Sequence, residues 1–226
     1  MYRFVFLDLD DTILDFHAQE RFAYAKALGE YGVPATESLL ARYHAANLVW
    51  WERHERGEVD RETLLVERHR AIFETLGVSV DPSAFEDRYR HWLGVGHTFV
   101  PGAPELLDYL KGKGYRLYLA SNGVAETQYT RLASAGIGSC FDRIFISEDL
   151  GSHKPERAFF DACFSAIPDF DPTAAVLVGD SLTSDVCGAK NAGIASIWFN
   201  RNGRIAPPEL RPDAEITTLE ELRRLL

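Results

Sequence analysis

Five almost uninterrupted apolar runs, each of strand length, are the feature that most constrains the fold of this chain. They occupy residues 4–7, 116–120, 143–146, 175–178 and 195–199. Strands whose apolar residues are consecutive are buried on both faces, which is typical of a parallel sheet covered by helices. The sequence therefore predicts a sheet of this kind at the centre of the fold.

Helix-like segments lie between the later runs, with apolar residues at three- and four-residue spacing. They are residues 103–113, 125–135, 156–166 and 184–192. Gly114, Gly136 and Gly193 lie where glycine commonly ends a helix. Alternating strands and helices predict an α/β fold, a doubly wound Rossmann-like parallel sheet with right-handed crossovers.

Residues 15–96 interrupt this alternation, and Asp60 and Asp81 are expected N-caps within them. The helices expected there span residues 17–31, 36–56, 60–76 and 82–93. An insertion directly after the first strand of an α/β sheet would lie above the carboxyl ends of the strands, where such sheets bind ligands. We therefore expect a core formed by residues 1–14 and 97–226 and an inserted helical lid formed by residues 15–96.

Composition limits the partners of the chain. Hydrophobic residues make up 46% of it and aromatic residues 12%, as in an ordinary globular protein. The formal net charge of −10 argues against a nucleic-acid polymer or an anionic membrane surface as the partner, and no stretch reaches the length of a membrane span. Three scattered cysteines without CxxC spacing indicate reduced thiols and a cytoplasmic location.

Carboxylates crowd the end of the first run, where Asp8, Asp10 and Asp11 precede Thr12. Three carboxylates in four residues repel one another, and a divalent cation would offset that repulsion. Magnesium prefers oxygen ligands and usually keeps waters and phosphate oxygens around it. An acidic turn capped by Thr12 is the alternative interpretation of these residues taken alone.

Polar groups also follow the second and third runs. Ser121, Asn122 and Gly123 could present hydrogen-bond donors to phosphate oxygens, although Ser-Asn-Gly is also a common turn. Lys154 could balance a phosphoryl group or a carboxylate. Taken alone, a surface lysine before the Pro155 start of a helix is the simpler interpretation.

A pair of carboxylates, Asp180 and Asp185, follows the fourth run. The pair can complete a cation site, whereas a helix N-cap with a first-turn acid explains one aspartate more easily than both. All of these polar groups lie at the carboxyl ends of strands in one predicted sheet, so they would converge on one crevice. That convergence favours a metal and phosphate site over four unrelated local features.

In this order along the chain, the four motifs resemble those of the haloacid dehalogenase superfamily. They are Asp8-x-Asp10-x-Thr12, Ser121, Lys154 and Gly179-Asp180…Asp185. The resemblance covers residues 1–13 and about 97–205, and the insertion resembles the all-helical cap domain of the family's C1 type. It implies a magnesium-dependent phosphomonoester hydrolase that acts on a small phosphorylated metabolite.

The resemblance also implies roles for single residues. Asp8 would be the nucleophile that forms an aspartyl-phosphate intermediate, and Asp10 would be the general acid and then the general base. Ser121 and Lys154 would hold the phosphoryl oxygens. Further substrate contacts would come from Asn122 and Gly123.

The implied cofactor is Mg²⁺, with Mn²⁺ as a substitute. Its ligands would be Asp8, Asp180 and the backbone carbonyl of Asp10, while Asp185 would hold the site together. Asp10 also bears on the reaction type, because dehalogenases and phosphonate-cleaving relatives lack a carboxylate there. The latter use a cap lysine, and Lys26 is the only lysine of the insertion. Asp10 therefore favours phosphatase or phosphomutase chemistry.

One stretch of the insertion, residues 47–61, is similar to the cap of YjjG-type pyrimidine 5′-nucleotidases. This similarity implies a nucleoside 5′-monophosphate as substrate, with Asn47, Trp51 and His54 as contacts. Aromatic rings can stack on a base. Equally, Trp50 and Trp51 could pack the helices of the insertion together.

Other functions stay open at this point. A sugar-phosphate or phosphoglycolate phosphatase, or a phosphomutase, would keep the chemistry and change the substrate. A non-enzymatic phospho-aspartate switch would use a similar set of groups, but in signalling receiver domains the lysine follows the last strand, whereas Lys154 precedes Asp180. The expected assembly is a monomer or a homodimer.

Overall fold

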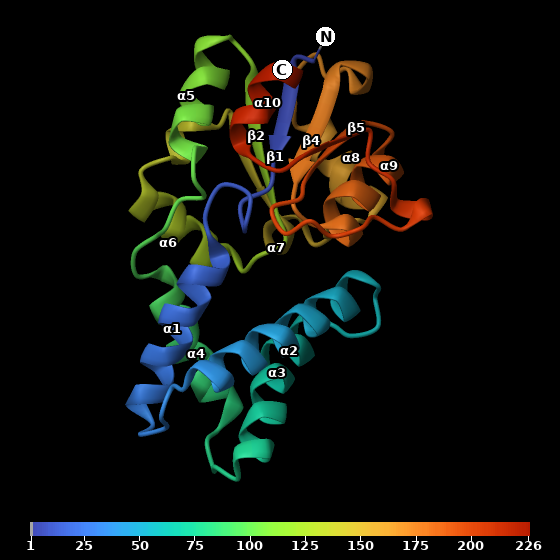
Figure 1. Ribbon diagram of the computed structural model, residues 1–226. Coiled ribbons are helices and arrows are strands. Elements are labelled where there is room, and N and C mark those ends of the chain that lie inside the picture. The colour runs from blue at the N-terminus through green and yellow to red at the C-terminus, as the bar shows by residue number, and fades with distance from the viewer. Residues whose placement is uncertain (1) are drawn as a thin grey trace. The chain divides into compact units, whose positions relative to one another are not determined.

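The computed structural model describes residues 2–226, which divide into two compact units. One unit contains the chain up to Asp15 together with Thr98–Leu226, and the other is Phe16–His97 (Figure 1). The second unit is therefore an insertion between the first strand of the sheet and the remainder of the first unit. Within the described residues, no helix has both the length and the hydropathy that crossing a membrane requires.

A fully parallel six-stranded sheet forms the centre of the first unit, which confirms the predicted fold class. Its strands are β1 (Phe4–Leu7), β2 (Arg116–Ser121), β3 (Arg143–Ile146), β4 (Ala175–Gly179), β5 (Ala195–Phe199) and β6 (Ala214–Ile216). The sequence analysis missed β6, because its three residues include Glu215 and form no apolar run.

Both faces of this sheet are buried, which explains the continuous apolar runs. Val5 and Leu7 pack into one core cluster, while Phe4 and Phe6 pack into another on the opposite face. Each large apolar side chain buried in this way contributes about 1.5–3 kcal/mol. Helices on the Val5 side are α5 (Ala103–Gly112), α6 (Ala125–Ala135) and α10 (Leu219–Leu225); those on the Phe4 side are α8 (Arg157–Ser165) and α9 (Cys187–Ala192) (Figure 1).

The strand order β3-β2-β1-β4-β5-β6 places the start of the chain in the middle of the sheet. The connections run outward in one direction from β1 and in the other direction from β4, so the order reverses between these two neighbours. In open α/β sheets, ligands bind outside the carboxyl ends of the strands at such a point. The amide of Asp8 donates to the carbonyl of Val178 at 2.9 Å, so the ends of β1 and β4 lie side by side there.

Four helices make up the second unit, as predicted for this segment. They are α1 (Phe16–Glu30), α2 (Glu37–Glu55), α3 (Arg61–Leu76) and α4 (Pro82–Gly94). Asp60 caps α3 by accepting from the amide of Thr63 at 2.7 Å, and Asp81 caps α4 by accepting from Ser83 at 3.0 Å. Each cap of this kind stabilises a helix by about 1 kcal/mol.

Candidate active site

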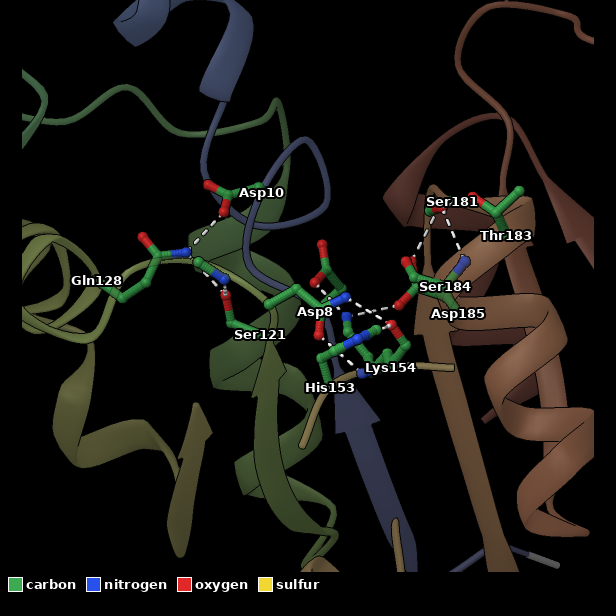
Figure 2. A network of polar contacts seen from close by, with 12 residues as sticks. Asp8, Asp10, Ser121, Gln128, His153, Lys154, Ser181, Thr183, Ser184 and Asp185 are labelled. Carbon is green, nitrogen blue, oxygen red and sulfur yellow. Dashed lines mark hydrogen bonds and ion pairs between the residues drawn. The ribbon is translucent and has the colours of Figure 1, made fainter. Parts of the chain in front are cut away.

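Asp8 and Lys154 form the buried centre of the candidate site. Asp8 directly follows β1, and the Nζ of Lys154 donates to Asp8 Oδ1 at 2.6 Å and to Asp185 Oδ1 at 2.7 Å (Figure 2). Burial by itself lowers the pKa of the Lys154 ammonium, but the Asp185 and Asp8 carboxylates outweigh it and raise that pKa above its usual range. Lys154 is therefore charged and offsets part of the surrounding negative charge.

A third carboxylate, Asp180 at the end of β4, completes a cluster with Asp8 and Asp185. One oxygen from each lies within 4.8 Å of the other two. Burial, with the like charges of Asp185 and Asp10 added, raises the pKa of Asp8 to about 8 although Lys154 opposes this rise. Desolvation and the charges of Asp8 and Asp11 likewise raise the pKa of Asp180. Lys154 and Arg204, whose guanidinium lies 3.7 Å from Asp180, carry two positive charges against three carboxylates, so this oxygen-only set fits a divalent cation such as Mg²⁺.

The Gly-Asp-Ser sequence after β4 explains how Asp185 reaches the cluster. A Cβ atom at Gly179 would lie 2.1 Å from Asp185 Oδ2, so only glycine leaves room for that carboxylate. The amide of Ser181 donates to the same oxygen at 3.0 Å, and Ser181 Oγ accepts from the amide of Ser184 at 3.1 Å (Figure 2). These contacts fold Leu182–Val186 into a π-helical turn, which is common at functional sites.

The Ser-Asn-Gly sequence at the end of β2 also lies in this region. Ser121 Oγ is buried and accepts from the amide of Gly123 at 3.1 Å and from Gln128 Nε2 at 2.8 Å. The side chain of Asn122 forms two hydrogen bonds with the backbone of Lys154. Its Oδ1 accepts from the amide and its Nδ2 donates to the carbonyl, both at 2.8 Å. A Cβ at Gly123 would lie 2.3 Å from Gln128 Nε2, so glycine is needed here too.

Two buried side chains that the sequence analysis did not single out hold Asp10. Gln128 Nε2 donates to Asp10 Oδ2 at 2.6 Å (Figure 2), and Arg131 Nη1 donates to Asp10 Oδ1. Arg131 Nη1 also donates to Gln128 Oε1 at 2.8 Å. Both residues lie on α6, three positions apart and therefore on one face. A polar pair on the inward face of a predicted helix was the signal that could have identified them.

Comparison with known proteins decides the family. The sequence model of the haloacid dehalogenase-like hydrolases matches residues 2–193. This chain belongs to that family. The individual relatives that match this chain indicate which members of the family it resembles.

Three relatives match nearly the whole of this family member. The HAD-hydrolase YfnB of Bacillus subtilis is 36% identical in sequence over 100% of this chain and 95% of its own length. The crystal structure of YfnB bound to magnesium superposes on this chain with a TM-score of 0.96, and the superposition covers 100% of this chain and 98% of the YfnB chain. The pyrimidine 5′-nucleotidase PynA of Streptococcus pneumoniae is 34% identical over 98% of this chain and 93% of its own. The pyrimidine 5′-nucleotidase YjjG of Escherichia coli is 28% identical over 98% and 96%.

The substrate contacts predicted in the insertion lie within the helical unit of this hydrolase. Asn47 is buried, and its amide donates to Glu20 Oε1 at 2.7 Å and accepts from Arg68 Nη1 at 2.8 Å. His54 is also buried, with its Nδ1 2.9 Å from a backbone carbonyl, and the half-buried Trp51 ring has its centroid 6.0 Å from that of His54. The amide of Asn47 is thus engaged inside the unit, and a substrate role for these three residues stays a prediction.

Proposed function

We propose that this chain is a magnesium-dependent phosphomonoester hydrolase that forms an aspartyl phosphate on Asp8. The observation that carries the proposal is the buried contact of Asp8 with Lys154 beside the oxygen cluster of Asp8, Asp180 and Asp185. A carboxylate held this way has a fixed position and a neighbouring positive charge. Phosphoryl transfer depends mainly on positioning and on stabilisation of charge, which are the properties that this site offers.

In the first step, Asp8 attacks phosphorus. Lys154 donates to Asp8 Oδ1, which leaves Oδ2 to form the new oxygen–phosphorus bond. The bond from phosphorus to the leaving oxygen breaks, and Asp10 gives its proton to that oxygen so that a neutral hydroxyl departs. Ser121 and Lys154 hold the phosphoryl oxygens. Mg²⁺, held by Asp8, Asp180 and the Asp10 carbonyl, would supply positive charge against the phosphoryl oxygens.

In the second step, water replaces the aspartyl oxygen. Asp10, now a carboxylate, removes a proton from the water as it attacks phosphorus. The phosphorus–oxygen bond to Asp8 breaks, inorganic phosphate leaves and Asp8 returns as a carboxylate. Asp10 is protonated again, so the cycle closes without another reactant.

We further propose nucleoside 5′-monophosphates, above all those of pyrimidines, as the substrates. PynA and YjjG, which are named for this activity, match 98% of this chain each, so the match includes the helical insertion. Trp50 and Trp51 on α2 are both half-buried, which leaves part of each ring surface available for stacking.

Phosphate release from a panel of monophosphates tests both parts of this proposal. The panel contains pyrimidine and purine nucleotides, sugar phosphates, phosphoglycolate and phosphoserine, each assayed with Mg²⁺ and with excess EDTA. We expect release only with Mg²⁺ and fastest release from pyrimidine nucleotides. Faster release from sugar phosphates would reject the substrate and keep the mechanism. An isomerised product would indicate a mutase, and inactivity on the whole panel would reject the hydrolase.

A further inference from the structure

Three groups that can ligate a metal gather in the helical unit, apart from the residues assigned to the hydrolase reaction. His17 and Glu20 lie three residues apart on α1 and so share a face, and His44 lies on α2. His44 Nδ1 is 2.5 Å from Glu20 Oε2 and 3.1 Å from His17 Nδ1. His17 Nδ1 is 3.8 Å from the same Glu20 oxygen. Two helices therefore bring two imidazole nitrogens and one carboxylate oxygen to a single point.

Hydrogen bonding alone accounts poorly for this convergence. A neutral imidazole carries one N–H, and an ionised carboxylate carries no hydrogen. His44 Nδ1 lies within hydrogen-bond distance of both Glu20 Oε2, at 2.5 Å, and His17 Nδ1, at 3.1 Å, so a single hydrogen on that nitrogen would be shared between two neighbours. If the nitrogens of His17 and His44 both carry hydrogens, those hydrogens face each other. A divalent cation instead accepts a lone pair from all three atoms at once.

The dimensions of the triangle suit such a cation. A point equidistant from atoms separated by 2.5, 3.1 and 3.8 Å lies about 1.9 Å from each. Zinc stands about 2.0–2.1 Å from histidine nitrogen and about 2.0–2.2 Å from carboxylate oxygen. His17 and His44 are partly exposed, so small rotations of their rings would even out the three separations and leave room for a water ligand.

A buried network fixes the orientation of Glu20. Its Oε1 accepts from Asn47 at 2.7 Å, and Asn47 in turn accepts from Arg68, which pairs with Glu86 at 2.7 Å. Glu20 is only 1% exposed and cannot turn away, so Oε2 stays aimed at His17 and His44. Glu86 pairs with both Arg68 and Arg90, whereas Glu20 reaches Arg68 only through the amide of Asn47. Supports of this kind commonly accompany metal ligands.

We propose that His17, Glu20 and His44 bind a divalent transition-metal ion of the zinc type. Imidazole nitrogen suits zinc, copper, iron and nickel, whereas Mg²⁺ prefers sites made entirely of oxygen. Two histidines with one carboxylate also form a recurrent protein zinc set, with a further position for water. The chain would thus hold two metals of different chemistry, one in each unit, and the second would tie α1 to α2.

Calorimetric titration of Zn²⁺ into the metal-stripped full-length chain, with Mg²⁺ kept saturating, tests the site directly. We expect one zinc equivalent per chain and a rise of a few degrees in the melting temperature. Co²⁺ in place of Zn²⁺ should give visible absorption bands of the intensity typical of four or five ligands. No zinc binding by the wild-type chain would overturn the proposal.

Matched variants locate the binding. His17→Gln and His44→Gln should each weaken zinc at least tenfold, and the double variant should lose both the zinc equivalent and the Co²⁺ bands. His91→Gln, which changes an exposed histidine of α4, should bind zinc as the wild type does. Asp8→Asn should also keep the zinc equivalent, because it alters the other unit. Circular dichroism establishes that each variant is folded. Zinc retained by the double variant, or lost from Asp8→Asn, contradicts the assignment.

Discussion

At the scale of single residues, the site depends most on the positive charge of Lys154. Its ammonium lies between two carboxylates, and the side chain is only 1% exposed. Lys154→Met keeps the length of the side chain and removes the charge, which leaves Asp8 and Asp185 buried without their partner. We expect activity to fall by about a thousandfold or more and stability by roughly 3–5 kcal/mol, the cost of an uncompensated buried charge.

Steady-state kinetics and urea unfolding measure these two effects. Lys111→Met is the matched control, because Lys111 is exposed and its ammonium donates to the carbonyl of Ser139 at 3.3 Å. If Lys154→Met resembled Lys111→Met in both measurements, Lys154 would be an ordinary buried lysine and the electrostatic description of the site would be wrong.

Asp10→Asn separates acid–base help from nucleophilic attack. The asparagine cannot deliver a proton, so hydrolysis of nucleotides should slow by about 10²–10⁴-fold. A p-nitrophenyl leaving group needs little protonation, so the first step with p-nitrophenyl phosphate should be slowed far less. Pre-steady-state kinetics on both substrates checks this difference. An equal loss on both would show that Asp10 acts in some other way.

The residues proposed as catalytic stood out in the sequence more clearly than the side chains that contact them. Asp8, Ser121 and Asp180 stand at or directly after strand ends, where position along the chain indicates a shared crevice, whereas Lys154 lies in the loop that precedes α8. Gln128 and Arg131 were missed because they lie inside a helix, and a polar pair on its inward face does not show which distant residue it contacts. Their partner Asp10 is 118 residues from Gln128, and only the fold brings them together.

At the scale of the elements, the turn after β4 requires a residue without a side chain at Gly179. The Cβ of Gly179→Ala would collide with Asp185, which must then move away from Lys154 and from the amide of Ser181. We expect magnesium affinity to fall by about 10–100-fold, as when residues that orient a metal ligand are changed. Titration of Mg²⁺ against activity measures this loss.

Gly138→Ala is the matched control for that substitution, because a Cβ at Gly138 would meet no described atom within 4 Å apart from those of its chain neighbours. It should leave the magnesium titration unchanged. Unchanged magnesium affinity in Gly179→Ala would mean that Asp185 tolerates displacement and does not hold the cation site together.

The elements themselves followed largely from the apolar pattern. Five strands and the four helices of the insertion were predicted from the spacing of apolar residues. Strands buried on both faces have consecutive apolar residues, whereas helices buried on one face have them three or four residues apart. The helix expected at 184–192 becomes α-helical only from Cys187, because the contacts of Asp185 and Ser181 form a π-helical turn before it. The short helices α7 (Ser147–Leu150) and α10 were missed, since seven residues or fewer carry little periodicity.

At the scale of the whole molecule, the two units should respond differently to acid. His69 is buried in the helical unit, and this burial lowers its pKa to about 4, although Glu86 opposes the shift. In the unfolded chain the pKa of histidine is about 6.5. Between these values the unfolded state binds more protons, so the free energy of unfolding falls as the pH drops from about 6.5 to about 4. The loss from this one group is about 3 kcal/mol.

Comparison of the wild type with His69→Gln isolates this effect. Trp50, Trp51 and Trp92 lie in the helical unit, so tryptophan fluorescence during denaturant unfolding reports mainly on it. Asp8 and Asp180 have raised pKa values and act in the opposite direction, but they contribute equally to both proteins. The variant should lose less stability on acidification. Parallel pH profiles for the two proteins would contradict the role of His69.

Isolation of the phosphorylated protein tests the central claim most directly. Acid quenching during turnover of a phosphomonoester with Mg²⁺, followed by peptide mass spectrometry, locates the phosphoryl group. We predict that it is carried by Asp8, that it accumulates further in Asp10→Asn with p-nitrophenyl phosphate, and that it is absent from Asp8→Asn. Full turnover without a phosphorylated peptide, or with the phosphoryl group on another residue, would contradict the aspartyl-phosphate mechanism.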